Sequence, residues 1–434
     1  MSTAVCAARV PQIRPTARGT VREHASWETW AALVLMLLVG YRAQPQGGIT
    51  VGDVVAIAAL PVTWRSARHS RIMGTILLAS VLALATGLSM SLLLTGDLAV
   101  SSTTRRFVLL MGAAIPAGAC AITWARDRLG LENAVIVFCI GLLLNAVQKV
   151  PSVTNPWKFA LGMPTSILVL ALAHRLGRRA EILAVAALGA VYLVKDSRSA
   201  VGFLLITGVL LLVQAVASWL RVSRPPRATA RLQVLSLVVL GAVTIMAVLS
   251  ASKSGLLGEA AQTRTVVQSD GSSSVLVQAR PELGASLTLI AHRLWGYGTG
   301  VVPSYSDVRV AMQGMSSLAS YDPQNNYVLG YMFSTAGVEL HSGLADLWVS
   351  FSLPGLLLGV LLLGTALIGL GRNLATLRSR GWVLLVCVVV VWNLLFGPLA
   401  DVMPYLQLAV AATATLPPVA LLEREHRRAG AVRG

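Results

Sequence analysis

Charged residues are scarce in this chain, because Asp, Glu, Lys and Arg make up only 12% of its 434 residues. A soluble globular protein usually carries about 25% charged residues, so the composition excludes a water-soluble enzyme. Apolar residues make up 55% of the chain, and the mean hydropathy is +0.72. The apolar runs are too long and too numerous for the cores of soluble domains. The sequence therefore predicts an all-α polytopic membrane protein.

Cysteine is also scarce. The four cysteines lie in the N-terminal tail or inside apolar runs: Cys6, Cys120, Cys139 and Cys387. No Cys-x-x-Cys spacing occurs, which excludes the usual pattern of zinc ligands. We expect neither a disulfide nor a zinc site.

Twelve apolar stretches are candidate membrane helices, although several hold only about 15 residues, below the roughly 20 that cross a bilayer core. They lie near 28–41, 50–64, 72–95, 107–124, 132–148, 159–173, 180–194, 200–220, 232–250, 344–370, 382–399 and 403–421. The predicted organisation is a basic tail (1–26), a nine-helix block (27–250), a long loop (251–343), a three-helix block (344–422) and a second basic tail (423–434).

The distribution of positive charge predicts the orientation in the membrane. If the N-terminus is cytoplasmic, 23 of the 35 Lys and Arg residues lie on the inner side. Short cytoplasmic loops carry an excess of Lys and Arg, whereas long loops cross the membrane whatever their charge. We therefore expect both termini in the cytoplasm and the loop 251–343 outside. The net charge of +17 then reflects the membrane, and no nucleic-acid partner is expected. The first 26 residues lack an apolar core, so no cleavable signal peptide is expected.

The long loop contains one regular pattern, which starts at Pro281, a residue suited to the first position of a helix. Apolar residues then recur at three- and four-residue spacing: Leu283, Leu287, Ile290 and Leu294. This spacing predicts an amphipathic helix along the membrane surface, with Arg280 before it and Arg293 near its end. The segment 295–300, Trp-Gly-Tyr-Gly-Thr-Gly, follows. Its glycines permit close backbone approach, in a phosphate cradle or in a simple turn.

A tight external turn between the seventh and eighth spans carries Lys195, Asp196 and Arg198. A structural interpretation is that Lys195 bonds the last carbonyls of the seventh span, while Arg198 pairs with Asp196 or reaches lipid headgroups. The alternative is that the two cations and the free amides of the eighth helix bind an anion such as a diphosphate. The planar, permanently charged guanidinium suits that role.

His341 lies directly before the tenth span, two residues after Glu339. Only His292 and His341 fall on the outer side, which is too few for a metal site. A histidine at a membrane interface is commonly a polar anchor. A neutral imidazole beside a carboxylate is also the usual group for accepting a proton near pH 7.

Together these features resemble the O-antigen ligase and O-antigen polymerase superfamily of polytopic bacterial envelope glycosyltransferases, which have about twelve spans and cytoplasmic termini. Ser197-Arg198 is similar to an external Ser-Arg motif of that superfamily. Arg280, with the helix and Gly-x-Gly segment after it, is similar to the motif of its large loop. His341, followed by Pro354-Gly355, is similar to its His-Asn motif.

The sequence also departs from the superfamily pattern at three positions. Ser342 stands where Asn is usual, Ser350 stands where an acidic residue is common, and Arg293 lies near a frequent Pro. These departures bear on the acceptor more than on the donor.

The resemblance implies a glycan donor linked through diphosphate to a polyprenyl lipid, and a glycan or glycolipid acceptor, at the outer side of the bacterial plasma membrane. Arg198 and Arg280 would neutralise the diphosphate, with Lys195 and Arg293 as further binding residues. His341 would accept the proton of the acceptor hydroxyl, with Glu339 orienting it, and the anomeric configuration would invert. The chain has no Asp-x-Asp pair, the motif that holds the ion in metal-dependent membrane glycosyltransferases. No metal and no cofactor are expected.

Two other functions are consistent with the sequence. A polyprenyl-glycan flippase, or another transporter with twelve spans, predicts charged residues at mid-depth in the membrane, and Asp53 is the main candidate for one. A catalytically silent scaffold would bind the diphosphate lipid without turnover. Within the transferase interpretation, a ligase and a polymerase differ only in the acceptor.

Overall fold

The computed structural model describes residues 27–44, 49–94, 97–219, 282–318, 337–375 and 379–416, together with residues 246, 250, 254, 255, 262, 280 and 332–334. Within these residues the fold is almost entirely helical, as the sequence predicts. The exception is an antiparallel pair of two-residue strands, β1 (Phe333–Ser334) and β2 (Gly337–Val338), shortly before His341.

The first eight predicted spans are all helices. They are α1 (Trp27–Gly40), α2 (Val51–Ala67), α3 (Arg71–Leu93), α4 (Ser102–Leu129), α5 (Leu131–Lys149), α6 (Gly162–Leu176), α7 (Arg178–Val194) and α8 (Arg198–Trp219). A 3-10 turn, η2 (Val150–Ser152), and a π-helical turn, η3 (Trp157–Leu161), lie between α5 and α6. The ninth predicted span, 232–250, lies outside the described residues except for positions 246 and 250.

The later part of the chain contains two loop helices and the last three predicted spans. They are α12 (Glu282–His292), α13 (Tyr305–Leu318), α14 (Gly343–Ala375), α15 (Gly381–Phe396) and α16 (Leu399–Thr415). The helix predicted after Pro281 is present as α12, whereas α13 has no counterpart among the predicted elements.

Six of the described helical segments are long and apolar enough to cross a membrane. They are α3, α4, α5 with η2, η3 continued by α6, α8 and α14. Two further helices, α1 and α15, are apolar but shorter. The structure therefore supports a membrane protein with six full-length candidate spans in its described part, and the number twelve stays a prediction.

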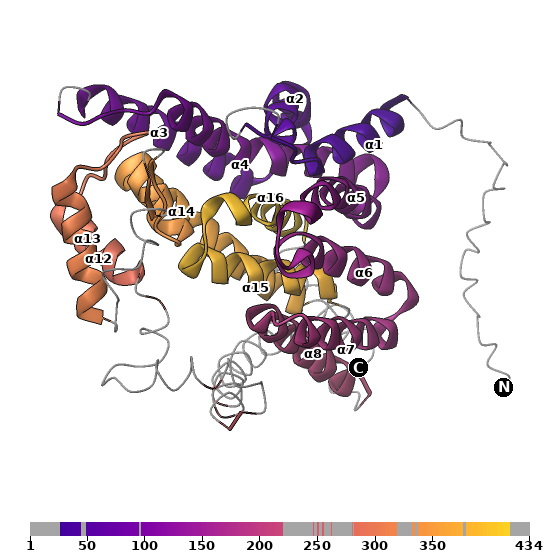
Figure 1. Ribbon diagram of the computed structural model, residues 1–434. Coiled ribbons are helices and arrows are strands. Elements are labelled where there is room, and N and C mark those ends of the chain that lie inside the picture. The colour runs from indigo at the N-terminus through magenta and orange to yellow at the C-terminus, as the bar shows by residue number, and fades with distance from the viewer. Residues whose placement is uncertain are drawn as a thin grey trace, which may run out of the picture.

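Helices α14, α15 and α16 lie at the centre of the molecule (Figure 1). Around them the earlier helices run from α3 and α4, through α1, α5 and α6, to α7 and α8 (Figure 1). In this arrangement α14 packs on α3, α16 on α4, and α15 on both α6 and α8. The loop helices α12 and α13 pack on each other at the edge next to α3 and α14. The ends of helices distant in sequence are thereby brought together.

Helix α14 is interrupted in its middle. Ser352 has φ 62° and ψ −157°, outside the helical region, and Pro354 lacks the N–H that would continue the helix. The carbonyl of Val349 instead accepts the amides of Tyr297 and Gly298, at 3.1 and 2.9 Å. A break in a membrane helix needs such replacement partners, because no water is present in the bilayer core to supply them. The segment 295–300 therefore completes the hydrogen bonding of α14.

The glycines of this segment allow that close packing. Gly296, Gly298 and Gly300 all have positive φ angles, at 70°, 98° and 72°. A β-carbon on any of them would lie 2.6 Å from a backbone atom of α14, α3 or α4. The amide of Thr299 donates to the carbonyl of Gly87, so the amides of residues 297–299 are all bonded within the protein. These bonds favour the simple-turn interpretation of the segment over a phosphate cradle.

Candidate functional site

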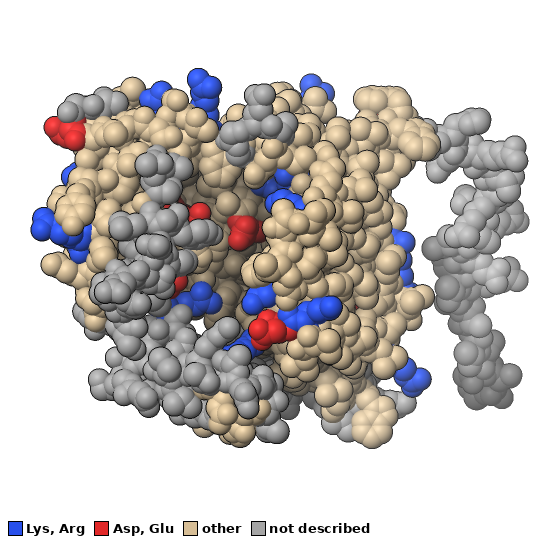
Figure 2. Space-filling view, in the orientation of Figure 1, with Lys and Arg blue, Asp and Glu red and all other residues tan. Residues whose placement is uncertain are grey.

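A cavity of about 290 Å³, here called the central cavity, lies where the ends of α4, α5, α15 and α16 meet η3. Its apolar lining is Phe107, Met111, Leu142, Ala146, Phe159, Ala160, Met163, Pro164, Phe203, Val389, Ala400 and Pro404. Its polar lining is Arg42, Gln44, Asn145, Lys149, Lys158, Asn393, Asp401 and Tyr405. Figure 2 shows a hollow near the middle of this face, with Lys and Arg on its walls and rim. The cavity thus combines an apolar interior with several cations.

The charged residues of the central cavity come from helix ends. Arg42 follows α1, Lys149 is the last residue of α5, and Asp401 lies in the first turn of α16. Lys158 belongs to η3, where the consecutive residues Lys158, Phe159 and Ala160 all line the cavity. Consecutive residues of an α-helix point about 100° apart, so a π-helical turn is a suitable element for presenting all three. The sequence places these charges at helix ends, and the fold gathers them.

The two lysines of the central cavity have no close carboxylate partner among the described residues. Arg42 binds Asp53 with both terminal nitrogens, at 2.9 and 3.1 Å. Within the described residues, neither Lys149 nor Lys158 has a carboxylate within 4.0 Å, and Lys158 Nζ lies 5.3 Å from the centre of the Phe159 ring. Asp401 lies within electrostatic reach of Lys149, His341 and Arg42. The cavity therefore carries excess positive charge.

The segment around His341 is fixed beside this cavity by Asp346, a buried residue in the first turn of α14. The Asp346 carboxylate accepts the amide of Leu340 at 2.8 Å and the amide of Leu399 at 3.0 Å. It thus joins the segment before α14 to the start of α16, which carries Asp401. His341 itself has a positive φ of 52°. Its Nδ1 atom lies 3.8 Å from Glu339 Oε1.

Arg280 and the turn before α8 lie next to the same cavity. The Arg280 guanidinium lies 5.6 Å from the centre of the Trp392 ring, and Trp392 makes an edge contact with Phe203, which lines the cavity. On the other side, Asn155 donates to the carbonyl of Lys195 at 2.7 Å and accepts the amide of Lys158 at 3.0 Å. The turn that holds Lys195 and Arg198 is therefore adjacent to η3.

Arg198 also has the acidic neighbour that the structural interpretation of the turn requires. Its Nε atom lies 3.6 Å from Asp196 Oδ1, and its side chain is 35% exposed. This separation exceeds the length of a hydrogen bond, so the pairing is loose. Arg198 remains accessible to a ligand.

Arg293 has a different environment from the other predicted site residues. Its Nε atom lies 3.1 Å from the fully buried carboxylate of Asp307, and its guanidinium lies 5.3 Å from the centre of the Tyr297 ring. Burial alone would raise the pKa of Asp307, but hydrogen bonds from Ser304 and Arg293 outweigh burial and lower it. Burial and the neighbouring Asp307 charge raise the pKa of Tyr297. Arg293 thus belongs to an ion pair that holds α12 and α13 together.

None of the residues predicted from sequence as site residues lines the central cavity itself. Its four charged lining residues, which the sequence analysis did not assign to the site, are Arg42, Lys149, Lys158 and Asp401. A signal for them exists, because each lies within two residues of the end of a predicted span on the outer side. Among the described residues, no group of three or more His, Cys, Asp or Glu is arranged to hold an ion.

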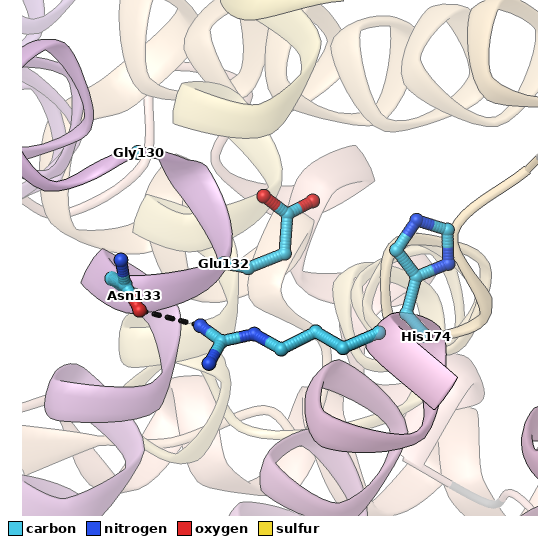
Figure 3. A pocket seen from close by; sticks show the side chains of 5 residues that line it. Gly130, Glu132, Asn133 and His174 are labelled. Atoms are coloured by element: carbon cyan, nitrogen blue, oxygen red, sulfur yellow. Dashed lines mark hydrogen bonds between the residues drawn. The ribbon is translucent and has the colours of Figure 1, made fainter. Parts of the chain in front are cut away.

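A second cavity, of about 490 Å³, lies at the opposite end of α5 (Figure 3). Glu132 and Asn133 of α5 face His174 and Arg175 of α6 across it (Figure 3). Its charged groups bind neighbouring helices: Glu132 pairs with Arg380 at 2.7 Å, and His174 pairs with the buried Glu181 at 2.9 Å. Arg175 donates to the side chain of Asn133. This cavity is a junction between helix ends, and we place the candidate site in the central cavity.

Comparison with known protein families, characterised proteins and solved structures finds no match to this chain. The function is therefore inferred from the chemistry of the site itself.

Proposed function

We propose that this protein transfers a glycan from a polyprenyl-diphosphate carrier to an acceptor hydroxyl at the outer face of the bacterial plasma membrane, as a ligase or as a polymerase. One observation carries the proposal: a cavity lined by several cations lies at the ends of apolar helices, and His341 is within electrostatic reach of Asp401, which lines it. A lipid-linked donor needs a site at that depth, because its diphosphate lies at the membrane surface and its chain lies in the bilayer.

In this proposal the cations beside α8 bind the donor. Arg280 and Arg198 neutralise the two phosphates, and Lys195 adds charge at the same turn. They stabilise the charge that develops on the diphosphate as it leaves, a role that a bound divalent ion plays in other transferases. Arg293, which Asp307 already holds, supports the segment 295–300 and lies behind this site.

The transfer itself is a single displacement. The acceptor oxygen forms a bond to the anomeric carbon, the bond from that carbon to the diphosphate oxygen breaks, and the diphosphate leaves with the electron pair. His341 takes the proton of the attacking hydroxyl. Glu339 and Asp401 lie close enough to stabilise the imidazolium that results. Attack opposite the leaving group inverts the configuration of the sugar.

The transporter alternative receives less support from the position of Asp53. This residue lies in the first turn of α2, near a helix end, and Arg42 neutralises it. A transporter of this size is expected to place charges at mid-depth in the membrane, between broken helices.

The orientation leads to a labelling prediction. A cysteine introduced at Tyr305, an exposed residue of α13, should react with a membrane-impermeant thiol reagent in intact cells. A cysteine at the exposed residue Arg179, at the start of α7, should react only after permeabilisation. Three of the native cysteines are buried, which limits background labelling. The opposite pattern would place the candidate site in the cytoplasm and contradict the proposed reaction.

Purified protein in nanodiscs, given a synthetic polyprenyl-diphosphate oligosaccharide, provides the test of function. We expect a lengthened or transferred glycan and a stoichiometric amount of free polyprenyl diphosphate. The reaction should continue in EDTA, because the cations of the site are side chains. Donor binding without product would favour a scaffold, movement of intact donor across a vesicle would favour a flippase, and strict dependence on added Mg²⁺ or Mn²⁺ would exclude the arginine mechanism.

A further inference from the structure

The central cavity contains a buried polar side chain that has no partner among the described residues. Asn145 is 8% exposed and lines the cavity, and its side chain makes no hydrogen bond there. The half-buried Tyr405 also lines the cavity, and its hydroxyl has no hydrogen-bond partner in the described part of the chain. Buried polar side chains in proteins are almost always satisfied, so Asn145 indicates a polar ligand.

The chemistry of the lining favours a ligand rich in hydroxyl groups. The amides of Asn145, Gln44 and Asn393 both donate and accept hydrogen bonds, whereas a phosphate group only accepts them. The carboxylate of Asp401 accepts hydrogen bonds from hydroxyls. The exposed ring of Phe159 offers an apolar surface against which the carbon face of a sugar ring can pack.

The charge of the cavity identifies a further group on the ligand. Arg42 is balanced by Asp53, which leaves Lys149 and Lys158 against Asp401, an excess of one positive charge. A single carboxylate on the ligand would make the net charge of the cavity zero, whereas a doubly charged phosphate ester would make it negative. Lysine also suits such a group, because its ammonium is a point charge with three rotatable donors.

The size of the cavity limits how much of the ligand it holds. Pockets for small ligands usually measure about 300–1,000 Å³, so this cavity of about 290 Å³ lies at the lower end of the range. It suits a sugar residue with its substituents, and the remainder of a longer glycan would extend out of the hollow seen in Figure 2.

We infer that the central cavity is a subsite for an acidic sugar, a ring that bears a carboxylate, in which Lys149 and Lys158 bind the carboxylate and Asn145, Tyr405 and Asp401 bind hydroxyls. The inference rests on the proposed function for its assumption that the ligand is a glycan. It adds that the glycan is anionic and that selection takes place beside His341. The acidic sugar belongs either to the donor glycan or to the acceptor.

The test compares two soluble trisaccharides that differ at one position, glucuronic acid in one and glucose in the other. Binding to the purified protein in nanodiscs is measured by calorimetry. We expect the acidic trisaccharide to bind about tenfold more tightly or better, because it adds a charge-assisted contact. Lys149→Gln and Lys158→Gln should each remove most of this preference while leaving the affinity for the neutral trisaccharide in place. Arg106→Gln, which removes an exposed cation of α4 outside the cavity, is the matched control and should change neither affinity.

Equal binding of the two trisaccharides, or an acid preference that survives both lysine substitutions, would overturn the inference. The outcome is separable from that of the transfer assay. Transfer without acid preference refutes the subsite and leaves the proposed function standing. Acid preference without transfer supports the subsite and refutes the proposed function. A neutral lipid-linked donor distinguishes the two sources: it should compete with the acidic trisaccharide if the subsite belongs to the donor, and leave its binding intact if the subsite belongs to the acceptor.

Discussion

Replacing His341 with alanine should reduce glycan transfer by about 10²- to 10⁴-fold, the usual contribution of a general base, while donor binding stays intact. The reason lies in how His341 is held. Asp346 ties its segment to the start of α16, and this places the imidazole within electrostatic reach of Asp401 and near Glu339. Asp346 thus fixes the segment of His341 next to the central cavity.

Two quantities are measured for the wild type and the variant: the initial rate of transfer and the affinity for the donor. His292→Ala is the matched control: His292 is the other histidine predicted to be external, lies 3.6 Å from Asp307, and should be dispensable for the chemistry. A variant that transfers glycan at the wild-type rate, or one that fails to bind donor, would exclude His341 as the base.

Replacing Arg280 or Arg198 with alanine should reduce transfer by about 10²- to 10³-fold, the range seen when a donor that stabilises developing charge is removed. Lysine in either position should still lose about tenfold or more, because it keeps the charge and lacks the planar fork that binds two phosphate oxygens at once. For Arg280 the contact with Trp392 also depends on the flat guanidinium.

A matched control exists for the Arg280 substitution. Arg309 lies 5.5 Å from the centre of the Tyr305 ring, in a similar contact outside the central cavity, and Arg309→Lys should leave transfer unchanged. The rate at saturating donor and the affinity for donor are both measured. Near-normal transfer by both lysine variants would remove these arginines from the site. A loss matched by Arg309→Lys would indicate a general effect on the loop helices.

The fold class could be predicted from sequence because lipid imposes one strong requirement. Every backbone group in the bilayer core needs a partner, so an apolar stretch of membrane length has to be helical. Eleven of the twelve predicted stretches coincide with described helices, and their ends agree within a few residues. The number of complete spans was harder to predict, since α1 and α15 are short and only six helical segments meet the length and hydropathy of a span.

The loop was less predictable than the spans. Helix α12 has an apolar stripe, and α13 has one too, because Val308, Ala311 and Met315 recur at helical spacing and are buried. The polar residues between them kept α13 out of the predicted elements. Its stability comes from packing on α12 and from the Asp307–Arg293 ion pair, which are tertiary contacts. The same ion pair explains why Arg293, counted from sequence as a substrate-binding residue, has a structural partner instead.

For the candidate site, the sequence by itself determined which residue types stand at the ends of the helices that are predicted to face outward. Arg198, Arg280 and His341 could be found there because charge is excluded from the bilayer core, and Lys149 or Asp401 carried the same signal. Only the tertiary structure decided which of these ends meet. The end of α5 and the turn η3 are close in the chain, whereas the start of α16 is far from both. It meets them because α14, α15 and α16 pack at the centre of the other helices. The positions of helix ends depend on how whole helices pack, and that packing depends on many side chains at once. A local pattern in the sequence therefore cannot predict which ends meet.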